Sequence, residues 1–228
     1  MKSISEIKRQ ARSALEGQWG LAVLLTFVVF LTTTFVPMIV EIVIKGGFES
    51  FSDLQQKSLS DNLVGFVFSL VFIPLTVATE WFYLTLARSK FPSISQVYGI
   101  YKDGKTSIKL IWVSILVGIF SFLWTLLLII PGIIKSLSYS QAFFLLRDHP
   151  EYTSLEAISE SKRRMKGYKW KYFLMNLSFI GWGLLCLISL GIGFLWLTPY
   201  ISTSMATFYN EFINNEDDLL EDKKALLL

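Results

Sequence analysis

The feature that most constrains this chain is the length of its apolar blocks. Few charges interrupt residues 21–44, 63–87, 108–146 and 172–212. A hydrocarbon core about 30 Å thick needs roughly 20 apolar helical residues, and only helices and closed barrels satisfy their backbone hydrogen bonds inside it. With 53% hydrophobic residues and a mean hydropathy of +0.51, the sequence predicts an all-α, polytopic integral membrane bundle.

The last two apolar blocks are too long for one crossing each. Residues 108–146 would form a helix of roughly 57 Å, so the block must turn back within itself. Proline and glycine break helices, and they occur at Pro131-Gly132 and again, as glycines, at Gly191 and Gly193. We predict six spans, with two tight outer hairpins made by spans three and four and by spans five and six: 21–44, 63–87, 108–130, 133–146, 172–189 and 192–212.

The two C-terminal hairpins also share a weak repeat. At a constant offset, Ser138, Ser140, Ala142 and Phe144 match Ser202, Ser204, Ala206 and Phe208. Apolar sequences match by chance, so a duplication and a coincidence both stay open.

The distribution of positive charge predicts the orientation. Lys and Arg accumulate in cytoplasmic loops, and six spans with a cytoplasmic N-terminus place all but three of the 21 cations on that side. The exceptions are Lys45, Lys57 and Lys135. A single crossing by 108–146 would reverse this balance, whereas a re-entrant segment at 133–146 would preserve it and stays an alternative. Both termini are therefore predicted to be cytoplasmic.

The segments outside the bilayer are short. We predict an amphipathic N-terminal cytoplasmic helix within 1–18, a polar loop at 45–62, a basic cytoplasmic linker helix within 147–171 and an acidic tail at 213–228. The linker opens with a capping-box pattern, Thr153 to Glu156. Anionic lipids of the inner leaflet attract basic residues, so we expect lipid headgroups to contact Lys162, Arg163, Arg164 and Lys166. The plainer alternative is that these charges only enforce topology.

Four polar side chains lie inside the predicted spans at a similar depth. Glu80 is eight residues before Arg88, about 12 Å along a helix, and the others are five or six residues from their own cytoplasmic ends. Polar groups in hydrocarbon are costly and are often functional. We predict a polar pocket for a headgroup, a small solute or an ion, lined by Glu80, Gln141, Asn176 and Ser204; interhelical hydrogen bonding is the plainer interpretation.

The sequence contains little that would support catalysis. His149 and Cys186 are its only histidine and cysteine, too few for a metal site of the usual composition. It has neither a phosphate-binding loop nor a dinucleotide-binding glycine motif. We therefore expect no enzyme, no cofactor and no metal, and a net charge of +3 gives little reason to expect nucleic acid as a partner.

Several segments together resemble a known family. They are KRQARSALEGQWG, IPGIIKSLSYSQAFFLLRDHP, SLEAISESKRRMKGYKWKYF and LSFIGWGLLCLISLGIGFLWLTPYISTSMATFYNEF. In combination they are similar to a bacterial integral membrane family catalogued as domain of unknown function nine hundred seventy-five. The resemblance covers essentially the whole chain and implies a six-helix protein of the bacterial cytoplasmic membrane, with no catalytic residue to transfer.

Two functional hypotheses follow from these observations. The first is a non-enzymatic membrane protein that binds membrane lipids or partner proteins, including a second copy of itself, and supports envelope homeostasis. The alternative is a small transporter or transporter subunit for a small or amphiphilic solute. Transporters place broken helices near the midplane, whereas the breaks here are predicted at the outer surface, which favours the first hypothesis.

Overall fold

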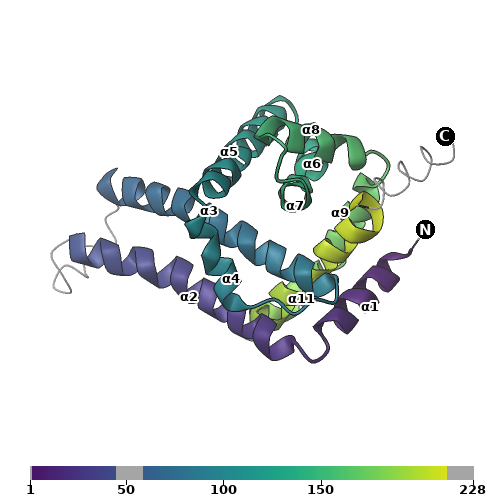
Figure 1. The fold of residues 1–228 in the computed structure, drawn as a ribbon, viewed down its shortest axis with the longest axis horizontal. Helices are drawn as coiled ribbons and strands as arrows, with labels where there is room; N and C mark the ends of the chain where they lie inside the picture. Colours follow the sequence, from purple (N-terminus) through teal and green to yellow (C-terminus); the bar gives the residue numbers. More distant parts are fainter. Residues whose placement is uncertain (1, 45–58, 215–228) are drawn as a thin grey trace.

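A computed structural model describes residues 2–44 and 59–214 of the chain (Figure 1). This part is mainly helical and contains no strand, which confirms the predicted all-α fold. The predicted loop at 45–62 and tail at 213–228 lie largely outside it. The helices are α1 (Ile4–Leu15), α2 (Trp19–Ile44), α3 (Leu59–Ala87), α4 (Ile94–Tyr98), η2 (Gly99–Lys102), α5 (Gly104–Leu127), α6 (Ile129–Tyr139), α7 (Ala142–Asp148), α8 (Ser154–Arg164), α9 (Lys169–Leu177), α10 (Ile180–Ile188), α11 (Phe194–Tyr209) and the π-helix η3 (Asn210–Asn214).

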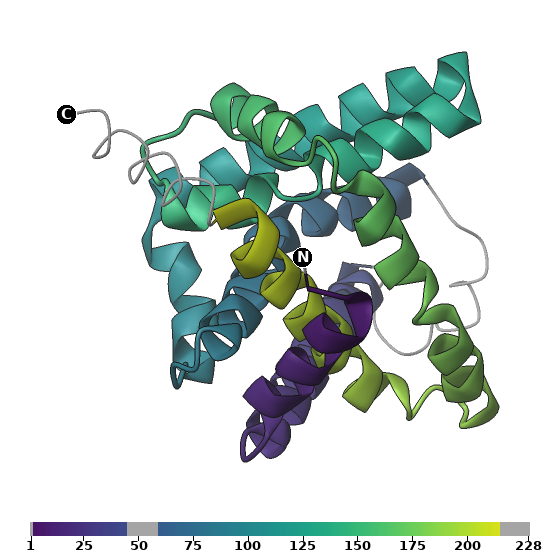
Figure 2. The same ribbon diagram turned by 90° about the vertical axis from the view of Figure 1, so that its right-hand side faces the viewer.

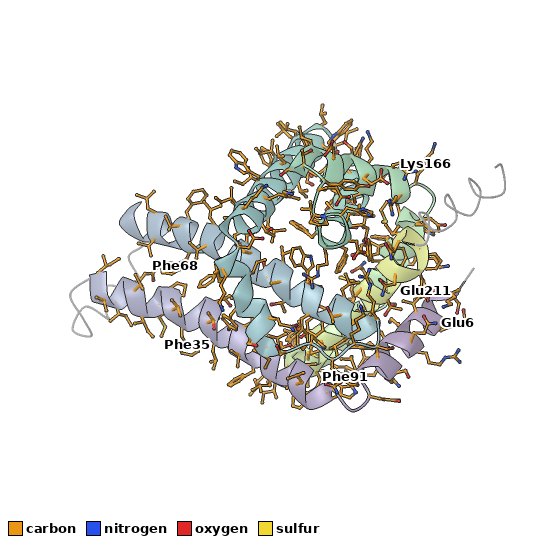
Figure 3. All side chains as sticks on the ribbon, viewed as in Figure 1. Glu6, Phe35, Phe68, Phe91, Lys166 and Glu211 are labelled. Carbon is orange, nitrogen blue, oxygen red and sulfur yellow. The ribbon has the colours of Figure 1, made fainter. Side chains whose placement is uncertain are left out.

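The first hairpin, formed by α2 and α3, carries apolar side chains where it extends away from the other helices, and charged side chains lie on the opposite side of the molecule. Phe35 and Phe68 lie on the part of the hairpin that extends away from the other helices, whereas Glu6, Lys166 and Glu211 lie on the opposite side (Figure 3). Exposed apolar surface of this extent is typical of a membrane-facing region. We call the region where α3, α7 and α11 end the charged end.

The second hairpin turns at Leu128, three residues before the predicted break. Leu128 has extended backbone angles between α5 and α6, and Pro131 lies in the first turn of α6, where a missing N–H costs no hydrogen bond. Gly132 instead permits close packing of the two helices, because a Cβ atom there would lie 2.2 Å from Thr125 Oγ1. The third and fourth candidate spans, Gly104–Leu127 and Ile129–Asp148, thus meet at Leu128, within a few residues of the approximate bounds predicted as 108–130 and 133–146.

Two further breaks divide segments that we predicted as single helices. The segment 133–146 is interrupted between α6 and α7, and the segment 172–189 between α9 and α10. At the first break the Ser161 hydroxyl of α8 accepts from the Gln141 amide at 3.1 Å and donates to the Ser138 carbonyl at 2.8 Å. This side chain therefore satisfies backbone groups at the break, as buried backbone requires.

The third hairpin turns where the sequence predicts it, at Ser189 to Gly193. Leu190 and Gly191 have positive φ values of 53° and 88°. A Cβ atom on Gly193 would lie 2.7 Å from Cys186 Sγ, so this glycine, like Gly132, allows a close approach. The predicted span 192–212 corresponds to α11 and most of η3.

Five helical segments among the described residues are long and apolar enough to cross a membrane. By length and apolar composition, the candidates are Trp19–Ile44, Asn62–Ala87, Gly104–Leu127, Ile129–Asp148 and Lys169–Ile188. α11 has 16 residues and is shorter than these. The protein is therefore a polytopic membrane bundle, and the sixth crossing depends on α11.

Three short helices divide the chain into tandem units. α1, α4 and α8 each begin with a capping box, formed by Ser3 with Glu6, by Ser93 with Gln96 and by Thr153 with Glu156. Each precedes a helical hairpin: α2 with α3, α5 with α6 and α7, and α9 and α10 with α11. The weak repeat of residues 138–144 and 202–208 lies in the second and third of these units, and duplication and coincidence both stay open for it.

The amphipathic helices α1 and α8 bury their apolar faces in protein. Ile7, Ala11 and Leu15 are fully buried, and α1 lies beside α11 (Figures 1 and 2). Ala157 and Ile158 are similarly buried in α8, which packs against α5, α6 and α7. The protein itself therefore covers most of the apolar face of each helix.

Candidate functional site

Glu80 and Ser202 meet where α3 packs against α11. The Ser202 hydroxyl donates to Glu80 Oε1 at 3.0 Å. Glu80 Oε2 is buried and has no hydrogen-bond partner in the described part of the chain. A buried carboxyl oxygen without a partner is uncommon, so this position is available to a ligand or to a proton.

Tyr172 of α9 brings further polar side chains to the same interior. Ser140, Gln141, Asn176 and Glu80 lie near its side chain, and Asn176 Nδ2 donates to the Tyr172 backbone carbonyl at 2.8 Å. Gln141 is fully buried and donates to Ser140 Oγ at 2.8 Å, but its Oε1 has no partner among the described residues. Three of the four predicted pocket residues, Glu80, Gln141 and Asn176, are thus gathered around one tyrosine.

Ser204, the fourth predicted residue, is turned back on its own helix. Its hydroxyl donates to the Tyr200 carbonyl at 2.7 Å, and in the described part of the chain it forms no hydrogen bond with the other three. Ser202 takes the place that we assigned to Ser204. This helix offered several small polar residues in succession, and the sequence could not show which one faces α3.

A second polar network ties the charged end together. Arg88, just after α3, makes two hydrogen bonds to Asp148 at the end of α7, at 2.7 and 2.6 Å. Tyr209 donates to Asp148 Oδ2 at 2.8 Å, and Arg88 Nε donates to Asn210 Oδ1 at 3.0 Å. These bonds to Asp148 raise the pKa of the Arg88 guanidinium. The network joins the last helix of all three units and was not predicted from the sequence.

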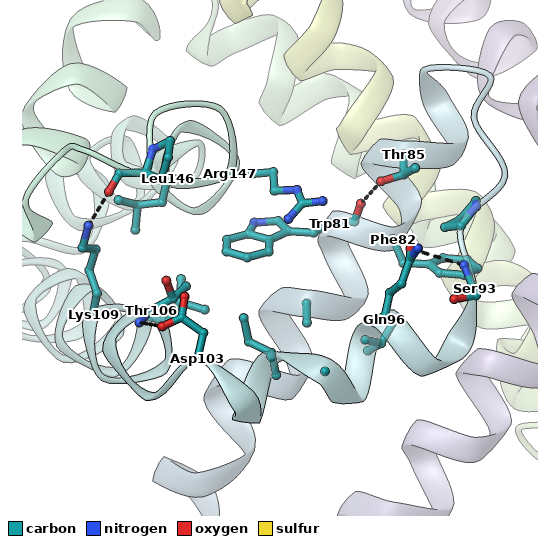
Figure 4. A pocket seen from close by; sticks show the side chains of 17 residues that line it. Trp81, Phe82, Thr85, Ser93, Gln96, Asp103, Thr106, Lys109, Leu146 and Arg147 are labelled. Carbon is teal, nitrogen blue, oxygen red and sulfur yellow. Dashed lines mark hydrogen bonds between the residues drawn. The ribbon is translucent and has the colours of Figure 1, made fainter.

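A cavity of about 390 Å³ opens between α3, α4, α5 and the end of α7 (Figure 4). Trp81 and Phe82 form an aromatic wall, and Asp103, Lys109 and Arg147 supply the charge. The Arg147 guanidinium carbon lies 5.2 Å from the Trp81 ring centroid, within cation–π distance, and Trp81 is held by donating Nε1–H to the Phe143 carbonyl at 2.8 Å.

The charges around this cavity leave positive donors available. Lys109 donates to the Pro150 carbonyl at 2.5 Å and lies within electrostatic range of Glu156, but neither Lys109 nor Arg147 forms an ion pair within 4 Å with a described residue. Asp103 caps α5 by accepting from the Thr106 amide, and its hydrogen bonds with Thr106 lower its pKa. The cavity therefore combines an apolar wall with two cations and one committed carboxylate, a composition suited to an anionic amphiphile.

The basic residues predicted to contact lipid headgroups do not share one face. Lys162, Arg163 and Lys166 are exposed, whereas Arg164 is only 1% exposed. Arg164 Nε donates to Glu160 at 2.6 Å and its NH1 donates to the Ile213 carbonyl at 3.0 Å. Hydrogen bonds from Arg163, and then from Arg164, lower the pKa of Glu160 to about 2. Arg164 is thus a buried structural residue, which corrects its assignment as a headgroup contact.

Metal and nucleophile chemistry finds little support in the described residues. They contain no group of three or more His, Cys, Asp and Glu side chains placed to hold a metal. His149 lies 3.1 Å from Glu151 and stacks on Tyr152, and Cys186 is buried against Gly193. Both residues therefore occupy structural environments.

Apolar helices that cross the membrane several times, with a polar interior and a charged end, define a multi-pass α-helical membrane protein. The chain belongs to the family described as "Protein of unknown function (DUF975)", whose model matches residues 1–138 and 125–216. The match confirms the family resemblance and includes all three units. No curated protein and no solved structure matches the chain.

Proposed function

We propose that the chain is a non-enzymatic protein of the bacterial cytoplasmic membrane that binds the anionic headgroup of a membrane lipid in the cavity between α3, α4, α5 and α7. The observation that carries the proposal is the pair of cations, Lys109 and Arg147, beside the aromatic wall at Trp81. A phosphate can accept charge-assisted hydrogen bonds from both cations, and the ring presents an apolar surface to the glycerol and upper acyl region.

The proposed orientation has both termini and the charged end in the cytoplasm. Its support is the accumulation of Lys and Arg in the segments that flank the spans. In this orientation the cavity lies at the depth of the inner-leaflet headgroups, and the exposed Lys162, Arg163 and Lys166 face the same leaflet. Through lipid or partner-protein binding, including self-association, the protein would support the homeostasis of the cell envelope.

The test is a comparison of lipid binding by the purified full-length protein in detergent. We expect fluorescent phosphatidylglycerol to bind more tightly than phosphatidylcholine, and Arg147→Gln to weaken the former by about tenfold, equivalent to about 1.4 kcal/mol. Lys105→Gln is the matched control, because Lys105 is an exposed lysine of α5 that does not line the cavity. Equal affinity for the two lipids, or equal effects of the two substitutions, would overturn the proposal.

One observation favours the alternative of a small transporter. Glu80 and Gln141 each have a buried oxygen without a partner in the described residues, as a site for a transported ion or polar solute would require. Flux of candidate solutes into proteoliposomes would distinguish the two functions. A transporter predicts flux that Glu80→Gln abolishes while phosphatidylglycerol binding is unchanged, whereas the lipid-binding proposal predicts no flux in either protein.

A further inference from the structure

A groove of about 470 Å³ runs between the end of α1, the start of α2 and the hairpin α10/α11. Arg12 and Trp19 lie at its α1/α2 side, and Ser189 and Gly193 lie at the hairpin turn. Between them the walls are formed mainly by Trp182, Leu185, Trp196 and Leu197. The groove shares no lining residue with the cavity at Trp81.

Arg12 is the one charged side chain that lines this groove. Its guanidinium carbon is 5.7 Å from the Tyr200 ring centroid, and it forms no ion pair or hydrogen bond with a described residue. The hydroxyl of Ser189 is already used, since it donates to the Cys186 carbonyl and accepts from the Gly193 amide. The groove thus presents one unpaired cation and an otherwise apolar, aromatic wall.

The groove opens to the surroundings of the helices, and of its lining residues Cys186 and Leu197 are buried. Trp182, Leu185 and Trp196 are each more than half exposed, although they belong to the membrane hairpin. In a bilayer the molecules that cover such a surface are lipids. From Gly193 to Tyr200 the groove follows α11 for seven residues, about 10 Å, so an acyl chain can lie along it while its phosphate reaches Arg12.

We propose that this groove binds one anionic phospholipid, with its phosphate on Arg12 and an acyl chain between Trp182 and Trp196. Charge complementarity identifies the headgroup, because no carboxylate lines the groove to neutralise Arg12. The apolar and aromatic wall identifies an acyl chain as the part of the ligand that lies along the groove. The bound lipid links the first unit, through α1 and α2, to the third unit, through α10 and α11.

The experiment uses the full-length protein in detergent and measures quenching of tryptophan fluorescence by dibrominated phospholipids. Bromine quenches at short range, so a chain in the groove should quench Trp182 and Trp196. We expect dibrominated phosphatidylglycerol to quench at lower concentration than dibrominated phosphatidylcholine. In an Arg147→Gln background, which weakens binding beside Trp81, the double substitution Trp182→Phe with Trp196→Phe should remove most of this quenched component and leave only the contribution of Trp19.

Two variants of α1 test the headgroup contact. Arg12→Gln should raise the half-quenching concentration of phosphatidylglycerol by about tenfold, while Arg12→Lys should retain most of the preference because it keeps the charge. Arg9→Gln is the matched control, since Arg9 is an exposed arginine of the same helix outside the groove. Arg147→Gln should leave this component unchanged, so the groove and the cavity at Trp81 can fail separately.

Three results would each overturn this proposal. They are equal quenching of the wild type by the two brominated lipids, equal effects of Arg9→Gln and Arg12→Gln, and undiminished quenching by phosphatidylglycerol when Trp182 and Trp196 are replaced in the Arg147→Gln background. The first and third of these results require no Arg12 variant, so the proposal stays testable if Arg12→Gln fails to fold.

Discussion

At the scale of single residues, Glu80 illustrates how a buried carboxyl group is accommodated by one hydrogen bond. Glu80→Gln keeps the acceptor for Ser202 and most of the volume, so we expect thermal stability in detergent to change by less than about 0.5 kcal/mol. Glu80→Ala removes the acceptor and leaves a void, which should cost about 2–3 kcal/mol. If Glu80→Gln unfolds as easily as Glu80→Ala, the negative charge itself is required, which would indicate a bound cation.

Substitutions in the Arg88–Asp148 pair should lower the free energy of unfolding, and the effects of the two single substitutions should not add. These side chains are 29% and 16% exposed, and Asp148→Asn should lower the free energy of unfolding by about 2–3 kcal/mol, because it weakens charge-assisted bonds from Arg88 and Tyr209. The double variant Arg88→Gln with Asp148→Asn should cost less than the sum of the single variants. A double-mutant cycle by thermal unfolding measures this coupling, and strictly additive losses would contradict it.

The sequence could place polar residues by depth but not by direction. Glu80, Gln141 and Asn176 were found from their distance to the nearest basic segment. A helix that is apolar on all sides gives no sign of which face is inward. This is why the sequence predicts Ser204 in the pocket, although Ser202 is the residue that contacts Glu80. The position of Tyr172 at the start of a predicted span gives no sign that its side chain faces the interior. The pairing of Arg88 with Asp148 requires the packing of two hairpins that the sequence does not specify.

At the scale of elements, the two hairpins depend on glycines that permit close helix packing. Gly132→Ala would bring a Cβ atom within 2.7 Å of the Thr125 Cα and 2.2 Å of its Oγ1, and the backbone atom cannot move aside easily. We expect a loss of about 1–3 kcal/mol, as for overpacked cores. Gly118→Ala is the control within α5, because no atom lies within 4 Å of the added Cβ, and thermal unfolding should show no loss. Equal behaviour of the two variants would contradict the packing of α6 on α5.

Glu160 of α8 should make the free energy of unfolding depend on pH. Its pKa is lowered from 4.5 to about 2 by Arg163 and Arg164, so its contribution to stability is complete above about pH 4.5 and is lost as the pH falls towards 2. Glu160→Gln should therefore lower stability by about 2 kcal/mol at pH 7 and by progressively less below pH 4.5. Unfolding of both proteins across this range measures the difference, and a constant difference would exclude Glu160 as its source.

The capped helices were predictable where the hairpin geometry was not. Both the capping box at Thr153 and the amphipathic pattern of α1 are local signals, and both helices form as expected. The break before α7 instead has a long-range partner, Ser161, and at the break before α10 Lys8 donates to the Ser178 carbonyl at 3.3 Å. Pro131 and Gly132 located the second turn only to within a few residues. The first turn of α6 tolerates Pro131, and Gly132 allows α6 to pack closely on α5, so neither residue marks the turn itself.

At the scale of the whole molecule, the three units close on one another at the charged end. Arg88, Asp148 and Asn210 each follow or end the last helix of a unit, and their hydrogen bonds join all three. The cavity lies between the first and second units, and the groove lies between the first and third. Both proposed lipid sites are therefore at unit boundaries, where packing between hairpins is interrupted.

This arrangement has a single consistent orientation in the membrane, which cysteine labelling can test. In a Cys186→Ala background, Lys166→Cys should react with an impermeant maleimide only after the cells are opened, because Lys166 is exposed on the linker that we predict to be cytoplasmic. Ser52→Cys, in the segment predicted to be extracytoplasmic, should react in intact cells. Lys166 is preferable to Ser161 as the probe, because the Ser161 side chain is buried at the break before α7. Labelling of Lys166→Cys in intact cells would reverse the orientation and move both lipid sites to the outer leaflet. Protection of Lys166→Cys until lysis, together with labelling of Ser52→Cys in intact cells, requires an odd number of crossings between the two positions. The predicted second, third and fourth spans provide three.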